Sequence, residues 1–361
     1  GDVANHAWGV MDVLATTDFP DWRTKNVVQS AGKGSLLMIP REGGNLVRCY
    51  VDLGEVPADD ASRVRATTVE RLIEVANHIL HPYSMDVRSV AWSSVYEVGQ
   101  RITDKFDDMP ADADADADTG RTPRVFICGD ACHTHSAKAG QGMNVSMQDA
   151  FNLGWKLAAV LEGRSGPSLL HTYSAERHAV AQDLTDFDKF WSAFIAQPTL
   201  DPAHPELGGV TTVEMQEEFA RQGRYTAGLA TTYGPSVLTG EGEHQALARG
   251  FEIGTRFHSA PVVRVADARS MHLGHAQRAD GRWRIFAFGG DDATQLLDLV
   301  RWLGTPESPI ARFTRAGEDL DSVIDVHGVF RHGPHEVDST ALPELLLPHS
   351  GPLSLQDWEK A

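Results

Sequence analysis

The sequence predicts a mixed α/β (α+β) fold built from more than one domain, and three observations support this class. The chain has 361 residues, which is enough for two or three domains with a sizeable core. Short β-type runs fill most of residues 6–98, and two long amphipathic helices follow between residues 142 and 194. Strand–helix–strand order returns after residue 280, which is typical of a separate α/β domain.

The N-terminal part alternates short apolar runs with Gly, Asp and Pro. The predicted strands are residues 6–14, 25–30, 35–40, 45–52 and 87–98. The second, third and fourth of these runs are close enough in sequence to pair as hairpins. Residues 61–80 predict a helix, because apolar side chains recur on one face and Pro82 follows its end. That face consists of Val69, Leu72, Ile73, Ala76, Ile79 and Leu80.

The segment RVFICGDACHTHSAKAGQGMN, residues 124–144, is the most informative stretch of the chain. Residues 125–127 predict an apolar strand that runs into Gly129 and Asp130, and a glycine-containing loop leads to a helix that opens near Gly142 and ends near Leu161. A carboxylate at a strand tip can hold a chain of sugar-like hydroxyls. A helix start offers N–H groups and a positive dipole end to an anionic ligand atom. The pattern predicts a ligand-holding site, and a flavin suits it best.

This segment has two alternative interpretations. Cys128, Cys132, His133 and His135 are dense enough to suggest zinc, but their spacing fits no standard pair of ligand hairpins, so no metal is predicted. The second alternative is purely structural, a strand-to-helix turn that needs glycine for its backbone conformation.

The C-terminal half continues with helix and then mixed structure. A second long helix is predicted over residues 170–194, where apolar side chains recur at three- and four-residue spacing. Residues 198–245 are partly helical and are interpreted as a connector. The last predicted elements are a strand at 282–288, a helix at 292–303 and a strand at 322–327.

Composition excludes some classes of partner. The formal net charge of −18 argues against a nucleic-acid backbone or an anionic membrane. Part of that charge lies in the run ADADADAD, residues 111–118, which predicts a solvated loop. No apolar stretch reaches membrane-spanning length, and no signal peptide is recognised. Three cysteines are too few for a disulfide framework, and we expect a cytoplasmic location.

A second group of polar residues lies on the predicted hairpins. Arg41, Arg48 and Tyr50 fall on adjacent β segments joined by Gly43 and Gly44, so one face could present cations and a phenol together. Half-buried packing is the simpler interpretation of these residues, and it applies equally to Tyr96 in the run SSVYEVGQR.

Longer stretches carry a family resemblance. GDACHTHSAKAGQGMNVSMQDAFNLGWKLA resembles the second flavin motif of the FAD-dependent phenol hydroxylases and 3-hydroxybenzoate 4-hydroxylase. NHAWGVMDVLATTDFPDWRTK, IPREGGNLVRCYVDL, HPYSMDVRSVAWSSVYEVGQR and TYSAERHAVAQDLTDFD resemble further stretches of that family in the same order. PVVRVADARSMHLGHA and GRWRIFAFGG resemble its thioredoxin-like C-terminal domain.

The resemblance implies a domain layout and a set of roles. The implied segments are a substrate-binding β-sheet layer at 1–120, a returning segment of a Rossmann-like FAD domain at 121–197, a helical connector at 198–245 and an incomplete thioredoxin-like domain at 246–361. Asp130 would bind the ribityl chain of FAD, and the backbone of Gly140, Gln141, Gly142, Met143 and Asn144 would face the pyrimidine edge of its ring. Tyr50 and Arg41 would be the catalytic residues: the Tyr50 hydroxyl would contact the substrate phenol, and Arg41 would lie near the flavin and the substrate. Tyr96 would line the pocket, and Lys25 would reach a substrate carboxylate.

The implied activity is a monooxygenase reaction. NADPH would reduce FAD, which would react with O2 to a flavin hydroperoxide that hydroxylates a phenolic ring, in a homodimer. Three features depart from the family: Ala137 replaces a proline, the C-terminal domain has no cysteine, and no GxGxxG follows a strand. The chain therefore looks like a piece cut at both ends and inactive by itself. A non-catalytic binding or dimerisation module is the alternative, and a related enzyme of larger polyketide-type rings is a third.

Overall fold

A computed structural model describes residues 2–30, 33–55, 64, 66–110, 121–135, 140–195, 200, 208–357 and 360. Contacts along the chain divide it into two compact units, Gly1–Glu241 and Gly242–Ala361. The mixed α/β class predicted from the sequence is confirmed. The acidic run 111–118 and Ala137 lie outside the described residues, as does most of the predicted helix before residue 66.

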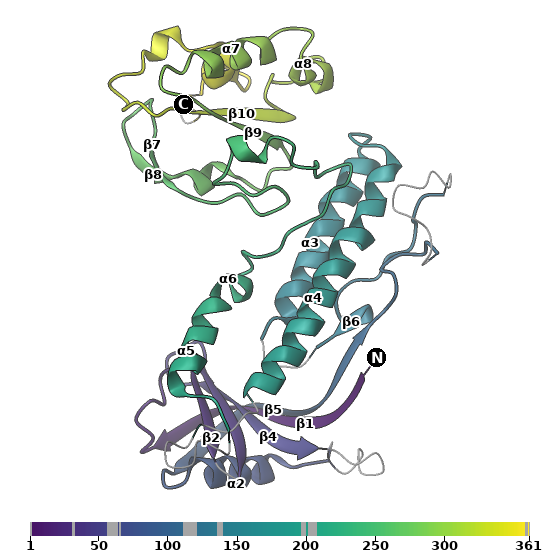
Figure 1. Cartoon of the computed structure of the whole chain (residues 1–361), viewed down its shortest axis with the longest axis vertical. Helices are drawn as coiled ribbons and strands as arrows, with labels where there is room; N and C mark the ends of the chain where they lie inside the picture. The colour runs from purple at the N-terminus through teal and green to yellow at the C-terminus, as the bar shows by residue number, and fades with distance from the viewer. Residues whose placement is uncertain are drawn as a thin grey trace. The chain divides into compact units, whose positions relative to one another are not determined.

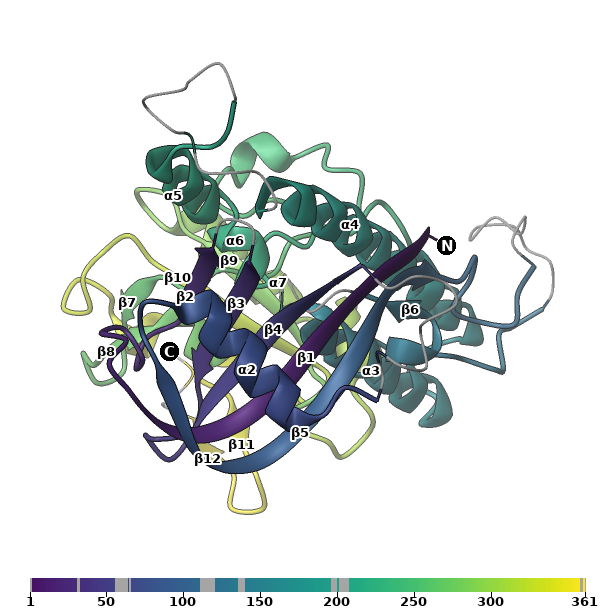
Figure 2. The same cartoon turned by 90° about the horizontal axis from the view of Figure 1, so that it is seen from below.

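The first unit is built on a six-stranded sheet in the order β2-β3-β4-β1-β5-β6 (Figures 1 and 2). Its strands are β1 Asp2–Thr17, β2 Asn26–Ser30, β3 Gly34–Pro40, β4 Val47–Glu55, β5 Met85–Ile102 and β6 His133–Thr134. All neighbouring strands are antiparallel. The five predicted strands are confirmed. β1 and β5 are longer than predicted because polar residues at their ends extend the ladder between them.

One face of this sheet forms the core with helix α2, Val69–Leu80, which lies across the strands in Figure 2. Strand side chains alternate between faces, so every second residue points at the helix. Gly9 allows the close approach, because a Cβ on this residue would lie 2.1 Å from Leu72 Cδ2. The helix begins later than predicted because Thr68 caps it, its hydroxyl accepting from the Arg71 N–H.

Two long helices, α3 Gly142–Leu161 and α4 His171–Ile195, lie side by side in Figure 1. Both were predicted, and α3 has the predicted bounds. The predicted strand at 125–127 is wrong, since only Phe126 forms a bridge, to Asp107. Asp108 Oδ1 accepts hydrogen bonds from the backbone N–H groups of Arg124 and Val125. These two N–H groups are therefore not available to pair with a neighbouring strand. Short helices α5, Thr212–Arg221, and α6, Gly223–Thr226, occupy the predicted connector.

The second unit contains the predicted strand–helix–strand pattern. Strands β9, Trp283–Phe288, and β10, Ile324–Val329, are parallel, and helix α7, Thr294–Leu303, stands between them in sequence. Parallel neighbours need such a crossover connection. The other elements are β7 Pro261–Val263, β8 Ser270–His272, α8 Pro309–Phe313, β11 His349–Ser350 and β12 Leu355–Gln356. Buried Leu296, Val300 and Ile310 form the centre of its core.

Candidate active site

The Gly129-Asp130 turn presents a carboxylate to solvent. It is a short 3₁₀ turn, η1 Gly129–Ala131, in which Gly129 has φ of +60°. A Cβ at Gly129 would also lie 3.1 Å from Ser146 Cβ, so glycine serves both the backbone and the packing against α3. The side chain of Asp130 is exposed. This geometry suits a residue that binds a polar chain approaching from outside.

The start of α3 presents backbone donors. The first helical hydrogen bond runs from the Val145 N–H to the Gln141 carbonyl at 3.0 Å, so the N–H groups of Gly142, Met143 and Asn144 have no acceptor within the helix. Gly140 has φ of +64°, and a Cβ there would meet no described atom within 4 Å. These amides and the positive end of the helix dipole fit the negatively charged edge of a reduced flavin ring. The chemistry of this loop therefore fits FAD.

A buried polar network is hydrogen-bonded to the Gly129-Asp130 turn. His133 Nε2 lies 2.6 Å from Asp149 Oδ2, and Arg177 Nε donates to Asp149 Oδ1 at 2.7 Å. The Gly129 N–H donates to the same Asp149 carboxylate at 3.2 Å. Arg177 also donates to the Tyr233 hydroxyl at 2.9 Å. Asp149 thus ties the Gly129-Asp130 turn to both long helices.

The network continues along the interface between the helices. Lys156 Nζ pairs with Glu176 Oε2 at 2.6 Å, and Asn152 Nδ2 donates to the same oxygen at 2.7 Å. The buried face of α3 is therefore polar, with Asp149, Asn152 and Lys156 at three- and four-residue spacing. Sequence analysis missed these residues. No local signal marks them, because Asn144, Ser146 and Gln148 are polar side chains of the same helix that are not buried in this way.

Burial and hydrogen bonding act in opposite directions on Asp149. Burial alone would raise the pKa of its carboxyl, but the hydrogen bonds from His133 and Arg177 outweigh this effect and lower the pKa. Asp149 is therefore a fixed anion beneath the turn.

The pKa of His135 gives a testable pH dependence. Burial, and then the adjacent His133 ring at 2.7 Å, lower it from 6.5 to about 4, although Asp188, Asp130 and Asp149 act in the opposite sense. Between these pH values the unfolded chain binds the proton and the folded chain does not. Stability should therefore fall as pH decreases from about 6.5 to about 4, by at most roughly 3 kcal/mol. Denaturant titrations of the wild type and His135→Gln at several pH values test this, and equal pH slopes would contradict it.

A metal ion is not favoured at this site. Cys132, His133 and Asp149 have ligand atoms within 4.8 Å of one another. However, Arg177 already pairs with Asp149 and would repel a cation. Burial, and secondarily Asp149, raise the pKa of the Cys132 thiol to about 12, so the thiolate that zinc requires is strongly disfavoured. Cys128 is exposed and is not one of these three residues.

The predicted substrate residues lie on the sheet face opposite α2. Tyr50 pairs with Val10, and Val10 pairs with Ser94, two residues before Tyr96 on the same strand. Because side chains alternate, Tyr50 and Tyr96 share this face, with β1 between their strands. Tyr96 is 46% exposed. The structure therefore brings the two predicted phenols to one surface.

An ion pair lies beside Tyr50 on the same face. Arg48 donates to both carboxylate oxygens of Asp12 at 2.7 Å, and its guanidinium lies 5.4 Å from the ring centre of Trp92. The hydrogen bonds to Asp12 raise the pKa of Arg48, and a hydrogen bond with Tyr50 adds to this effect. Sequence analysis had placed Arg48 near Tyr50 but had assigned it no role.

The two other predicted residues lie nearer the sheet edge. Arg41 follows β3, pairs with Glu42 at 2.9 Å and lines a cavity of about 450 Å³ with Trp22 and Arg23. Arg41 also contributes to lowering the pKa of Asp12, after the larger effect of Arg48. Lys25 is exposed just ahead of β2, so β3 separates its strand from that of Tyr50.

The helix-start amides and the exposed carboxylate together describe the cofactor site of a flavoprotein. A family model described as "FAD binding domain" matches residues 1–188. A second, described as "Phenol hydroxylase, C-terminal dimerisation domain", matches residues 231–361. The first match covers more than half of the chain, so the chain belongs to the FAD binding domain family.

Individual relatives agree with this assignment. The chain is 55% identical, over all of its length and 56% of the relative, to a 3-hydroxybenzoate 4-monooxygenase from Comamonas testosteroni. It is 35% identical, over 92% of its length and 52% of the relative, to a phenol 2-monooxygenase from Aspergillus fumigatus. The chain thus spans about half the length of these curated relatives.

A solved structure shares the fold. OxyS, an anhydrotetracycline hydroxylase from Streptomyces rimosus, superposes with a TM-score of 0.56 at 23% identity, over 91% of this chain and 55% of that one. At this identity the likeness extends to the fold alone.

Among the described helices, none is long and apolar enough to cross a membrane.

Proposed function

We propose that the protein hydroxylates a phenolic ring with FAD, NADPH and O2. The observation that carries this proposal is the exposed Asp130 carboxylate next to the helix-start amides of Gly142, Met143 and Asn144, fixed by Asp149. Asp130 would bind the ribityl chain of FAD, and the backbone from Gly140 to Asn144 would face its pyrimidine edge. FAD, when bound and reduced by NADPH, would supply the electrons that activate O2.

The sheet face would hold the substrate. The Tyr50 hydroxyl would hydrogen-bond the phenol oxygen, which favours an electron-rich, phenolate-like ring. Arg48 supports this role, because its guanidinium group hydrogen-bonds the Tyr50 side chain. The Asp12 carboxylate neutralises the positive charge of Arg48. Tyr96 and Trp92, with ring centres 6.4 Å apart, would cover the substrate with apolar surface and exclude water. Arg41 would add positive charge at the edge of this face.

The relative at 55% identity is named for 3-hydroxybenzoate, so we propose a hydroxybenzoate as the first substrate to assay. Lys25 is proposed to reach its carboxylate.

The match to a dimerisation domain supports a homodimer, and we expect a cytoplasmic enzyme with the four-segment domain layout given above. Because no GxGxxG follows a strand, the 361-residue chain alone is expected to turn over little substrate.

Flavin retention tests the cofactor assignment. In the full-length protein, Asp130→Ala should weaken FAD binding about tenfold or more, because a charge-assisted hydrogen bond is lost. Gly142→Val should weaken it as well, because the new side chain would obstruct the helix start. Among the described atoms, a Cβ at this position would be in ordinary van der Waals contact with His135 at 3.9 Å, so we expect the variant to fold. FAD affinity would be measured by flavin fluorescence during dilution.

Asp104→Ala, at an exposed acid after β5, is the matched control and should leave FAD binding unchanged. If both Asp130→Ala and Gly142→Val retain FAD with wild-type affinity, the assignment of this loop is wrong.

A further inference from the structure

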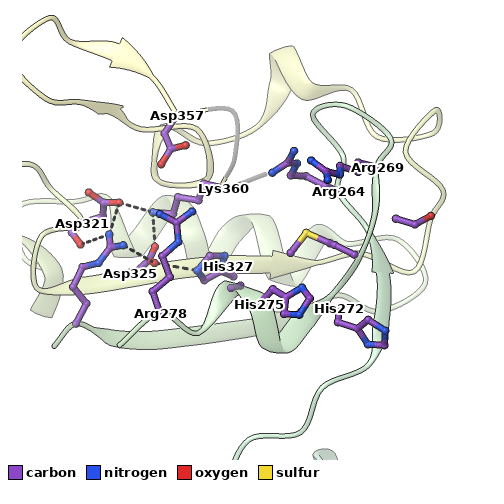
Figure 3. A pocket seen from close by; sticks show the side chains of 14 residues that line it. Arg264, Arg269, His272, His275, Arg278, Asp321, Asp325, His327, Asp357 and Lys360 are labelled. Carbon is purple, nitrogen blue, oxygen red and sulfur yellow. Dashed lines mark hydrogen bonds and ion pairs between the residues drawn. The ribbon is translucent and has the colours of Figure 1, made fainter. Parts of the chain in front are cut away.

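The second unit contains a cavity of about 480 Å³ that the proposed function does not use (Figure 3). It is lined by Arg264, Arg269, His272, His275, Arg278, Arg282, Asp321, Asp325, His327, Asp357 and Lys360, among others. The lining residues come from β8, from β10 and from segments that flank β7, β9, β10 and β12. A volume of this size suits a small molecule.

The inner wall of the cavity is an ion cluster. Lys360 Nζ lies 2.9 Å from Asp325 Oδ1 and 3.3 Å from Asp321 Oδ2, and only 3% of the Lys360 side chain is exposed. His327 Nε2 lies 3.0 Å from Asp325 Oδ2, and Arg282 Nη1 lies 3.3 Å from Asp321 Oδ2. Burial would raise the pKa of Asp325, but the hydrogen bond with His327 and the Lys360 charge lower it. The buried carboxylates are therefore already compensated by protein cations.

The outer wall adds further positive charge. Arg264 pairs with Asp267, which lies at its solvent side with 44% of its side chain exposed. Figure 3 shows Arg264 and Arg269 on one side of the hollow, Lys360 and Arg278 on the other, and His275 near its floor. Arg269 and Arg278 are exposed, so their guanidinium groups can adjust to a ligand. Cations therefore face the hollow from two sides.

The kind of cation that lines the cavity identifies the class of ligand. Four of its five Arg and Lys side chains are arginines, and two carboxylates outside the lining, Asp267 and Asp280, hold Arg264 and Arg282 in place. Planar guanidinium groups bind carboxylate and phosphate oxygens in pairs. We propose that this cavity binds a small polyanion, a molecule with two or more carboxylate or phosphate charges that reach both walls. This site lies within the second unit and does not depend on the flavin assignment.

Calorimetric titration of the full 361-residue chain with citrate and, separately, with inorganic phosphate tests the proposal at constant ionic strength. At least one probe should bind with a Kd below about 1 mM. Binding of citrate alone would identify a carboxylate-type ligand, and binding of phosphate alone a phosphate-type ligand. The double variant Arg269→Gln/Arg278→Gln should weaken binding about tenfold or more, because two charge-assisted contacts are lost.

The matched control is Arg301→Gln/Arg312→Gln, at exposed arginines of α7 and α8 in the same unit and outside the cavity. It should bind the probe like the wild type. Thermal melting without anion verifies that both double variants are folded. The proposal is overturned if neither probe binds, if Arg269→Gln/Arg278→Gln binds with wild-type affinity, or if the control variant loses as much affinity. Neither FAD nor a phenol enters these measurements, so the result is independent of the proposed hydroxylation.

Discussion

Replacing Asp149 with Ala should lower the free energy of unfolding of the first unit by about 3–5 kcal/mol, because it leaves a buried charge without its partner. Asp149 is fully buried and accepts hydrogen bonds from the Arg177 guanidinium and the Gly129 N–H. Arg177 is only 1% exposed, so water cannot replace the missing carboxylate. Denaturant titration followed by tryptophan fluorescence would measure the loss, since Trp155 and Trp191 lie on α3 and α4.

Two further variants separate charge pairing from general disruption. Asp186→Ala removes an exposed acid from α4, and its effect should stay within about 0.5 kcal/mol. The double variant Asp149→Ala/Arg177→Met should be more stable than Asp149→Ala, because it removes the uncompensated cation. A loss below about 1 kcal/mol for Asp149→Ala would contradict the role given to this network.

Tyr50→Phe in the full-length protein should lower kcat by about a hundredfold, in the range expected for loss of a group that assists proton or charge movement. The FAD content should stay at the wild-type level, because Tyr50 lies on the sheet and not on the loop from Gly140 to Asn144. Initial rates with 3-hydroxybenzoate and with phenol, together with the flavin absorbance per protein, are the measurements.

Tyr83→Phe is the matched control for this change. Tyr83 is 40% exposed, follows α2 in the sequence and packs edge-on against Phe19. Its loss of a hydroxyl should leave turnover unchanged. Turnover of Tyr50→Phe within a factor of about two of the wild type would remove Tyr50 from the reaction.

Local signals explain the elements that sequence analysis predicted well. The bounds of α3 follow from the glycine at its start and from Gly163, which adopts φ of +69° just beyond its end. The strands of the sheet follow from short β-type runs bounded by Gly, Asp and Pro, and this signal is local to each run. The strand predicted at 125–127 failed because Asp108 captures its backbone donors, and a side chain more than fifteen residues away is invisible to a local pattern.

The residues of the candidate site also fall into those that a local stretch of sequence reveals and those that it does not. Asp130 and the helix-start amides could be found from one contiguous stretch, and Tyr50 and Tyr96 from a family resemblance. Asp149 and Arg177 could not, because each appears as an ordinary surface charge until α3 and α4 are placed together. His133 and His135, together with Cys128 and Cys132, suggested a metal by their density, although their spacing fitted no standard site. In the structure their ring nitrogens lie 2.7 Å apart, and His133 continues to Asp149, so they form a hydrogen-bonded chain.

The polar interface between α3 and α4 has a consequence for how the first unit tolerates change. Apolar helices can slide or rotate slightly and still bury the same area, whereas the Asp149–Arg177 and Lys156–Glu176 pairs match in a single alignment. Shifting one helix by a turn would leave four buried charges without their partners and without contact to water. The alignment of α4 therefore dictates where the first turn of α3 sits, and substitutions distant from the ligand loop can still displace it.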